Sequence, residues 1–167
     1  MNNLTNSASE GGASLPALSR SHTILAVDDE PINLRTLDRL LRRHFRVLTA
    51  ANGDEALQLL AREDVSLILT DQRMPGMQGT ELLRKSRALN PDMVRMVVTA
   101  TNDSDTFIDA IKNSGAIRVI SKPWDPDKVL QAIHEALARY ERLLENKEAM
   151  RRLKQANEEL NKIVRRG

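Results

Sequence analysis

The chain has 167 residues, a formal net charge of +2, 41% apolar side chains, 2% aromatic side chains and no cysteine. This length and composition suit one ordinary domain with an aliphatic core, and the lack of cysteine excludes disulfides and thiolate metal sites. No stretch is long and apolar enough to cross a bilayer, and the first basic residue, Arg20, comes too late for a secretory signal, so we expect a cytoplasmic chain without a membrane partner.

Residues 1–20 are rich in Asn, Ser, Gly and Ala without periodicity, which predicts a disordered leader. From Thr23 onward, short β-like runs alternate with helical periodicities, which is typical of a doubly wound α/β fold with a parallel sheet. We therefore expect one α/β domain over residues 21–138. Its five predicted strands are Thr23–Val27, Phe45–Ala50, Val65–Thr70, Val94–Thr99 and Ile117–Ile120.

Helices are predicted between these strands and after the last one, with starts and ends marked by proline, glycine or asparagine. They are expected from Pro31 to His44, from Asn52 through Leu60, from Gly79 to Asn90, from Asp103 to Gly115, and onward from Pro123. The last of them has no obvious stop signal, so we expect it to continue into residues 139–167.

Residues 139–167 form a charged tail with nine Lys or Arg against five Glu. Starting the heptad at Leu143 puts apolar or Asn residues at positions a and d: Leu143, Asn146, Met150, Leu153, Asn157, Leu160 and Val164. A lone Asn at a fixes register and favours two strands. We interpret the tail as an extended helical coiled coil that makes a homodimer, with a solvated helical linker as the alternative. The mixed charge and the acidic remainder argue against nucleic-acid binding.

Carboxylates stand at the ends of two predicted strands, Asp28 and Asp29 after the first and Asp71 after the third. Ligands of open α/β sheets bind at the carboxyl ends of the strands, so the three groups are expected to share one crevice. Their mutual repulsion calls for a hard divalent cation, and Mg²⁺ favours a few carboxylates together with retained waters. The sequence therefore predicts a Mg²⁺ site there.

Two further strand ends supply a hydroxyl and an ammonium group. Asp71 lies before a turn-rich loop, where an exposed carboxylate can attack a phosphoryl group and form an acyl phosphate. Thr99 ends the fourth strand and can donate to a phosphoryl oxygen. Lys122 ends the fifth and can pair with Asp71 at rest and with phosphate afterwards. Each residue alone has a common structural role, but together they predict a phosphoryl-accepting pocket.

The motifs at these four strand ends resemble those of the receiver domain of two-component response regulators over about residues 21–139. They are Asp28-Asp29-Glu30, Asp71 with Met74-Pro75-Gly76, Thr99-Ala100 and Lys122-Pro123. The resemblance implies a flavodoxin-like doubly wound five-stranded parallel sheet of order 2-1-3-4-5. It also implies a signalling phosphoacceptor with self-phosphotransfer and autodephosphorylation chemistry rather than an enzyme.

The resemblance further implies a role for each residue of the site. Asp71 would accept phosphate from a sensor histidine kinase or phosphotransfer protein, Thr99 would reorient toward the phosphoryl group, and Lys122 would hold it. Asp29, Asp71 and the main-chain carbonyl of Arg73 would ligate Mg²⁺, with Asp28 helping through water. The peptide bond between Lys122 and Pro123 is often cis in such domains.

One position departs from the family pattern. Receivers usually carry a Tyr or Phe three residues before the lysine, and this chain has Val119. Aromatic coupling to the fourth helix is therefore in question, and Trp124 is either a substitute readout or a packing residue. The side chains of Arg73 and Thr101 are expected to flank the phosphoryl group, where they can control access of hydrolytic water.

Two alternatives compete with a phosphorylated receiver. An aspartate-nucleophile phosphatase needs a second acid two residues after Asp71, where this chain has Arg73. A constitutive receiver-fold module for dimerisation or docking would need no phosphate. The motifs around Asp71 and Lys122 look most like receivers that precede HD-GYP, diguanylate cyclase or other effector domains, so any output is expected beyond residue 167.

Overall fold

The computed structural model describes residues 14–18, 20–100 and 102–166. One five-stranded sheet with the order β2-β1-β3-β4-β5 forms its centre, and every neighbouring pair of strands is parallel. The strands are β1 (Thr23–Val27), β2 (Arg46–Ala50), β3 (Leu67–Asp71), β4 (Val94–Ala100) and β5 (Arg118–Lys122). The flavodoxin-like fold and the strand order predicted from the sequence are confirmed.

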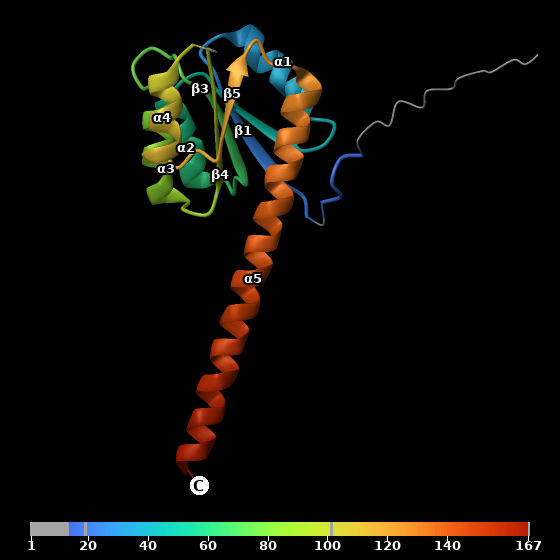
Figure 1. Cartoon of the computed structure of the whole chain (residues 1–167), viewed down its shortest axis with the longest axis vertical. Coiled ribbons are helices and arrows are strands. Elements are labelled where there is room, and N and C mark those ends of the chain that lie inside the picture. The colour runs from blue at the N-terminus through green and yellow to red at the C-terminus, as the bar shows by residue number, and fades with distance from the viewer. Residues whose placement is uncertain (1–13, 19, 101, 167) are drawn as a thin grey trace, which may run out of the picture.

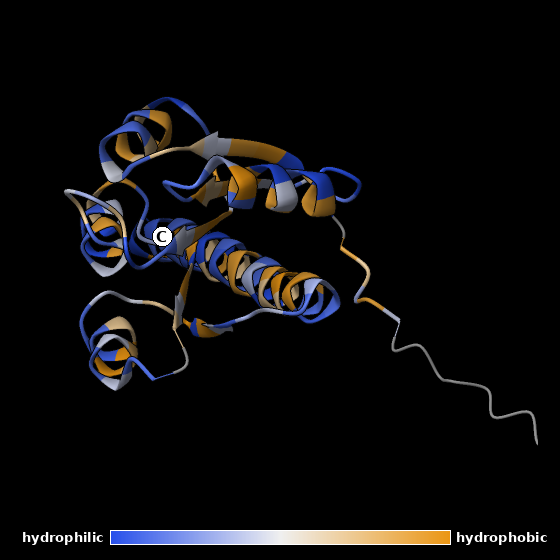
Figure 2. Ribbon diagram, turned by 90° about the horizontal axis from the view of Figure 1, so that it is seen from above, coloured by the Kyte–Doolittle hydropathy of each residue, from blue (hydrophilic) through white to orange (hydrophobic). Residues whose placement is uncertain are grey.

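Helices cover both faces of the sheet (Figure 1). They are α1 (Pro31–Leu41), α2 (Gly53–Arg62), α3 (Gly79–Leu89), α4 (Ser104–Lys112) and α5 (Pro126–Arg166). Apolar side chains of α1 and α5 pack on one face, and those of α2, α3 and α4 pack on the other. Figure 2 shows hydrophobic residues along the strands and on parts of each helix, with hydrophilic residues over much of the remaining helix surface. The sheet is thus buried on both sides, as parallel sheets require.

The strands end close to where the sequence predicts, and the third strand matters most for function. β3 begins at Leu67, two residues later than predicted, and includes Asp71 as its last residue. Parallel pairing continues to this end, because Asp71 is in register with Val98 of β4. The carboxylate of Asp71 is therefore fixed by the sheet itself rather than by a loop.

Helix α5 begins at Pro126, three residues later than predicted, because Asp125 caps it. The Asp125 Oδ1 atom accepts hydrogen bonds from the main-chain N–H groups of Asp127 at 2.8 Å and Lys128 at 3.2 Å. The helix then runs for 41 residues without a break. Its distal part projects from the body (Figure 1), and the apolar heptad positions of that part are exposed, including Leu153 at 64% and Val164 at 77%.

The predicted disordered leader, residues 1–20, needs a partial correction. Residues 1–13 and 19 lie outside the described part of the chain. Leu15 and Leu18 are partly buried and pack against the core cluster that α1 and α5 share. These two leader side chains therefore contact the body of the domain. The sequence rule for leaders counts periodicity, and two isolated leucines in an irregular segment give none.

A buried pair fastens α5 to the start of β1. The Glu141 carboxylate contacts the His22 ring nitrogen Nε2 at 2.8 Å, and both side chains are almost fully buried. The same carboxylate accepts the main-chain N–H of Arg20 at 2.9 Å, and the other His22 ring nitrogen lies 2.9 Å from the Ser66 hydroxyl. Glu141 is the last buried residue of α5, and the helix leaves the body after a further contact, the ion pair between Lys147 and Asp92.

Within the described residues, no helix combines the length and the apolar character needed to span a membrane.

His134, on the buried face of α5, is a second histidine of interest. Its ring packs against Phe45 and His44, with ring centroids 5.0 and 5.5 Å away, and neither ring nitrogen has a well-formed hydrogen bond. Burial and then the neighbouring His44 lower the pKa of His134, and a main-chain interaction with Pro16 only partly offsets this. The folded protein therefore disfavours a charged His134.

We predict that His134→Leu makes folding stability less dependent on pH. A histidine whose pKa is lower in the folded than in the unfolded state stabilises the fold above about pH 6.5, and this contribution is lost as the pH falls below that value. Urea unfolding at about pH 7.5 and about pH 5.5 should show a smaller loss of stability in the variant than in the wild type. Equal losses in the two proteins would contradict the prediction.

Candidate functional site

The acidic residues meet at the carboxyl edge of the sheet. Asp71 ends β3, and Asp28 and Asp29 directly follow β1, its neighbour in the sheet. Each of these three residues offers a carboxylate oxygen, and those atoms all lie within 4.8 Å of one another. Asp28 and Asp71 are buried, whereas Asp29 is exposed. The crevice expected from the sequence therefore exists, with one side open to solvent.

Lys122 reaches this cluster from β5. Its Nζ atom lies 2.7 Å from Asp71 Oδ1. Burial lowers the pKa of Lys122, but the hydrogen bond and charge of Asp71, with smaller effects of Asp28 and Glu30, outweigh it and leave the pKa raised. Lys122 is thus a stable cation at neutral pH, and it balances one carboxylate of the cluster. The peptide bond between Lys122 and Pro123 is cis, as the resemblance implies.

Asp28 is held in place by the start of α1. Its Oδ1 accepts the main-chain N–H of Glu30 at 2.9 Å, and its Oδ2 accepts the Asn33 side-chain amide at 3.0 Å. Burial raises the pKa of Asp28, and the charge of Asp71 adds to this, although these hydrogen bonds oppose it. Sequence analysis missed Asn33, whose only signal is its position in the first turn of α1, after Pro31.

The loop after Asp71 is anchored by its own polar groups. The Gln72 side-chain carbonyl accepts the main-chain N–H of Thr80 at 2.9 Å, which ties the end of β3 to the start of α3. A side chain at Gly79 would bring its Cβ within 2.3 Å of the Asp71 main-chain oxygen. Gly76 has φ of +82°, a region that favours glycine. The two glycines let the chain turn sharply and return close to Asp71.

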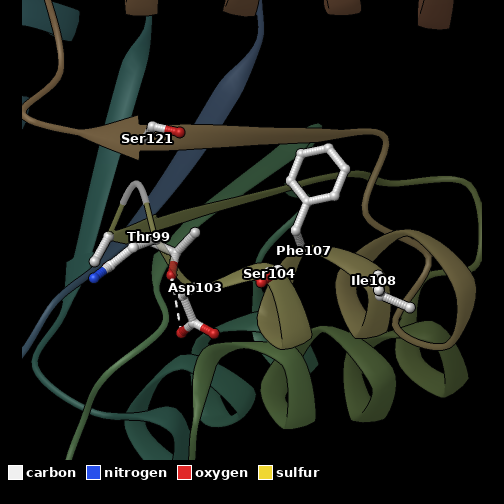
Figure 3. A pocket seen from close by; sticks show the side chains of 8 residues that line it. Thr99, Asp103, Ser104, Phe107, Ile108 and Ser121 are labelled. Carbon is white, nitrogen blue, oxygen red and sulfur yellow. Dashed lines mark hydrogen bonds between the residues drawn. The ribbon is translucent and has the colours of Figure 1, made fainter.

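Thr99, near the end of β4, makes a contact that sequence analysis did not find. Its hydroxyl donates a long hydrogen bond, 3.4 Å, to Asp103 Oδ2 in front of α4 (Figure 3). Arg73, whose side chain is exposed, approaches the same carboxylate oxygen at 3.8 Å. Hydrogen bonds from Thr106, with smaller contributions from Arg73 and Thr99, lower the pKa of Asp103. Thr101, the other residue expected to flank the site, lies outside the described part.

Val119 and Trp124 occupy opposite faces of the sheet. Val119 is partly buried against the cluster on the α2–α4 side, and Trp124 packs against the cluster that α1 and α5 share. These contacts favour the packing role for Trp124. On the side of Val119, a cavity of about 270 Å³ lies between the end of β4, α4 and β5, lined among others by Thr99, Asp103 and Phe107.

Comparison with known proteins gives consistent matches. The family model described as the response regulator receiver domain matches residues 24–134. The hydrogenase transcriptional regulatory protein HoxA of Cupriavidus necator is 43% identical over 115 residues, which are 69% of this chain and 24% of HoxA. This chain spans about a quarter to a third of the length of the curated relatives it matches.

Solved structures agree with the expected kind of receiver. The structure described as adenylate cyclase from Rhodopirellula baltica has a TM-score of 0.75 and 33% identity, covering 79% of this chain and 98% of that one. The signal receiver domain of an HD domain-containing protein from Pseudomonas fluorescens has a TM-score of 0.70 and 32% identity, covering 73% and 98%. The similarity to receivers of cyclase and HD-domain proteins, expected from the sequence, is confirmed.

We predict that Asp28→Asn stabilises the metal-free protein by roughly 1 kcal/mol. The amide removes a buried charge that Asp71 repels, and its oxygen can still accept the Glu30 N–H. The gain should shrink at acidic pH, because an acid whose pKa is raised by folding becomes protonated there and loses the unfavourable charge. Urea unfolding in EDTA measures it, with Glu145→Gln as a control on the exposed surface of α5. A variant no more stable than this control would refute the prediction.

Proposed function

Because the chain belongs to the response regulator receiver domain family, we propose that it is a phosphoryl-accepting switch in which Asp71 receives phosphate from a sensor histidine kinase or phosphotransfer protein. The observation that carries this proposal is the 2.7 Å contact between Lys122 and Asp71 beside the two further carboxylates. Such a cluster is unfavourable as a purely structural element, and it becomes useful when an anionic group must be received.

The proposed reaction uses side chains already in the crevice, together with a Mg²⁺ ion. One oxygen of Asp71 attacks the phosphorus of a phosphohistidine, the new O–P bond forms as the P–N bond breaks, and the imidazole leaves and takes up a proton. Lys122 then pairs with a phosphoryl oxygen, and the Thr99 hydroxyl donates to another. The resting ion pair therefore keeps the cation where the product needs it.

The residues also fit a Mg²⁺ ion. Three carboxylate oxygens within 4.8 Å of one another, with one side of the crevice exposed, match the preference of Mg²⁺ for a few carboxylates and several waters. In this proposal Asp29, Asp71 and the main-chain carbonyl of Arg73 would hold the ion, and Asp28 would help through water. When bound, the ion would neutralise phosphoryl oxygens during transfer.

We predict that acetyl phosphate with Mg²⁺ adds one phosphoryl mass to the wild-type protein and none to Asp71→Asn. EDTA should abolish the reaction in the wild type, because the crevice would then repel the incoming anion. Intact-mass spectrometry provides the measurement, and Asp64→Asn, an exposed carboxylate outside the crevice, is the control. A wild-type protein that stays unmodified under all conditions would favour the alternative, a constitutive dimerisation or docking module.

The proposed domain organisation is a leader, a receiver over residues 21–138 and a helical dimerisation segment over residues 139–167. Its support is the single helix α5, which starts beside the phosphoryl site and exposes heptad positions after Glu141. Exposed leucines at regular heptad spacing gain most by packing against a second copy. Phosphorylation would then act on whatever follows by changing how two such helices pack.

We predict that the double variant Leu153→Glu, Leu160→Glu is a monomer while the wild type is a dimer. Two charges in the apolar seam would stand opposite like charges of the partner helix. The control is Gln155→Glu, Lys162→Gln, which changes the net charge equally at positions outside the seam. Analytical ultracentrifugation with and without beryllofluoride gives the oligomeric state. A wild-type protein that is monomeric in both conditions would favour the solvated linker.

A further inference from the structure

The carboxylate in front of α4 joins three separate elements. Asp103 caps the helix, because its Oδ1 accepts the main-chain N–H of Thr106 at 3.1 Å. Its Oδ2 accepts the Thr106 hydroxyl at 2.6 Å and the Thr99 hydroxyl of β4 at 3.4 Å. The guanidinium of Arg73, from the loop after β3, lies 3.8 Å from the same oxygen. Figure 3 shows the Thr99 and Asp103 side chains turned toward each other.

Two of these partners, Thr99 and Arg73, also belong to the proposed phosphoryl site. A threonine hydroxyl carries one hydrogen, so Thr99 can donate to Asp103 or to a phosphoryl oxygen, but not fully to both. An anionic acceptor makes the stronger kind of hydrogen bond in either case. The Asp103 carboxylate and the phosphoryl group therefore compete for the same donor.

Few buried apolar contacts hold helix α4 against the body. Among its residues only Thr106 and Ala110 are buried, and the large apolar side chains of Phe107, Ile108 and Ile111 are about half exposed. The cavity of about 270 Å³ lies directly beneath its first turn. Elements with few buried apolar contacts move at low free-energy cost. The contact between Thr99 and Asp103 is thus a side-chain tie between β4 and the start of α4, beside the main-chain hydrogen bond from Asp103 to Ala100 at 3.1 Å.

We propose that Asp103 is a positioning residue that holds the Thr99 hydroxyl, and with it the start of α4, in the unphosphorylated arrangement. This inference rests on the proposed phosphoryl transfer to Asp71. When Thr99 turns to the phosphoryl group, Asp103 keeps its two contacts with Thr106 and so still caps α4. The main-chain hydrogen bond from the Asp103 N–H to the Ala100 carbonyl of β4, at 3.1 Å, also remains, but the side-chain tie to Thr99 is lost. The exposed guanidinium of Arg73 can likewise move from the Asp103 carboxylate to the phosphoryl group.

The test compares rates of phosphorylation by acetyl phosphate in Mg²⁺. Asp103→Asn and Asp103→Ser both keep a good N-cap and remove the charge that competes for Thr99. Each is expected to react roughly 3- to 10-fold faster than the wild type, as expected when one modest hydrogen bond no longer favours the resting state. Asp105→Asn removes the same charge from the first turn of α4 and should leave the rate within about 2-fold of wild type.

A second comparison separates the tie from a general charge effect. In a Thr99→Val background the hydroxyl is gone, so adding Asp103→Asn should no longer change the rate. If the acceleration persists in that background, or if Asp103→Asn and Asp103→Ser behave like Asp105→Asn, the inference is overturned. Thermal unfolding verifies that each variant is folded. A wild-type protein that takes no phosphate would instead refute the proposed function, which is a distinct result.

Discussion

Electrostatic repulsion among three carboxylates at one edge of a parallel sheet is the constraint on which this molecule is built. The strands bring Asp71 and Asp28 together because β1 and β3 are neighbours with the same direction, and both side chains are buried. Lys122 offsets part of the repulsion at 2.7 Å, but one cation cannot balance three anions. Burial, with the charge of Asp71 adding to it, raises the pKa of Asp28, so the folded protein disfavours the charged form of this residue. Under the proposed function, the fold gives up some stability to keep a site ready for a cation and an anionic group.

The rest of the body keeps this cluster rigid and connects it to the tail. Helix α5 starts four residues after Lys122, near the carboxyl ends of the strands, and runs along the sheet to the amino ends of the strands. There Glu141 contacts His22, which directly precedes β1. The helix is thus fixed at both ends of the sheet before it projects into solvent (Figure 1). A rigid helix held in this way moves as one piece when β5 or α4 shifts, because packed elements change position together.

Sequence reasoning predicted well what depends on local periodicity and chain direction. Strands such as Thr23–Val27 were identified from short apolar runs, and the meeting of Asp28 with Asp71 follows from the parallel direction of the neighbouring strands β1 and β3. Contacts between distant segments were not predictable in this way. Glu141 was counted only as one charge of a charged tail, yet it pairs in the core with His22, 119 residues away. Asp103 was recognised only as the start of a helix, because nothing local indicates that Thr99 faces it.

Under the proposed function, Val119 in place of an aromatic residue limits which side chains can couple the phosphoryl site to the surface of the domain. Val119 is partly buried and branched at Cβ, so it has no long arm to move between a buried and an exposed position. Trp124 is packed on the opposite face of the sheet, against the core of α1 and α5. The connection that can still exchange partners is the hydroxyl of Thr99, which links the end of β4 to the carboxylate that caps α4. Under the proposed function, a chain with Val119 in place of the aromatic residue would signal through the first turn of α4 rather than through β5, because few buried contacts resist displacement of that turn.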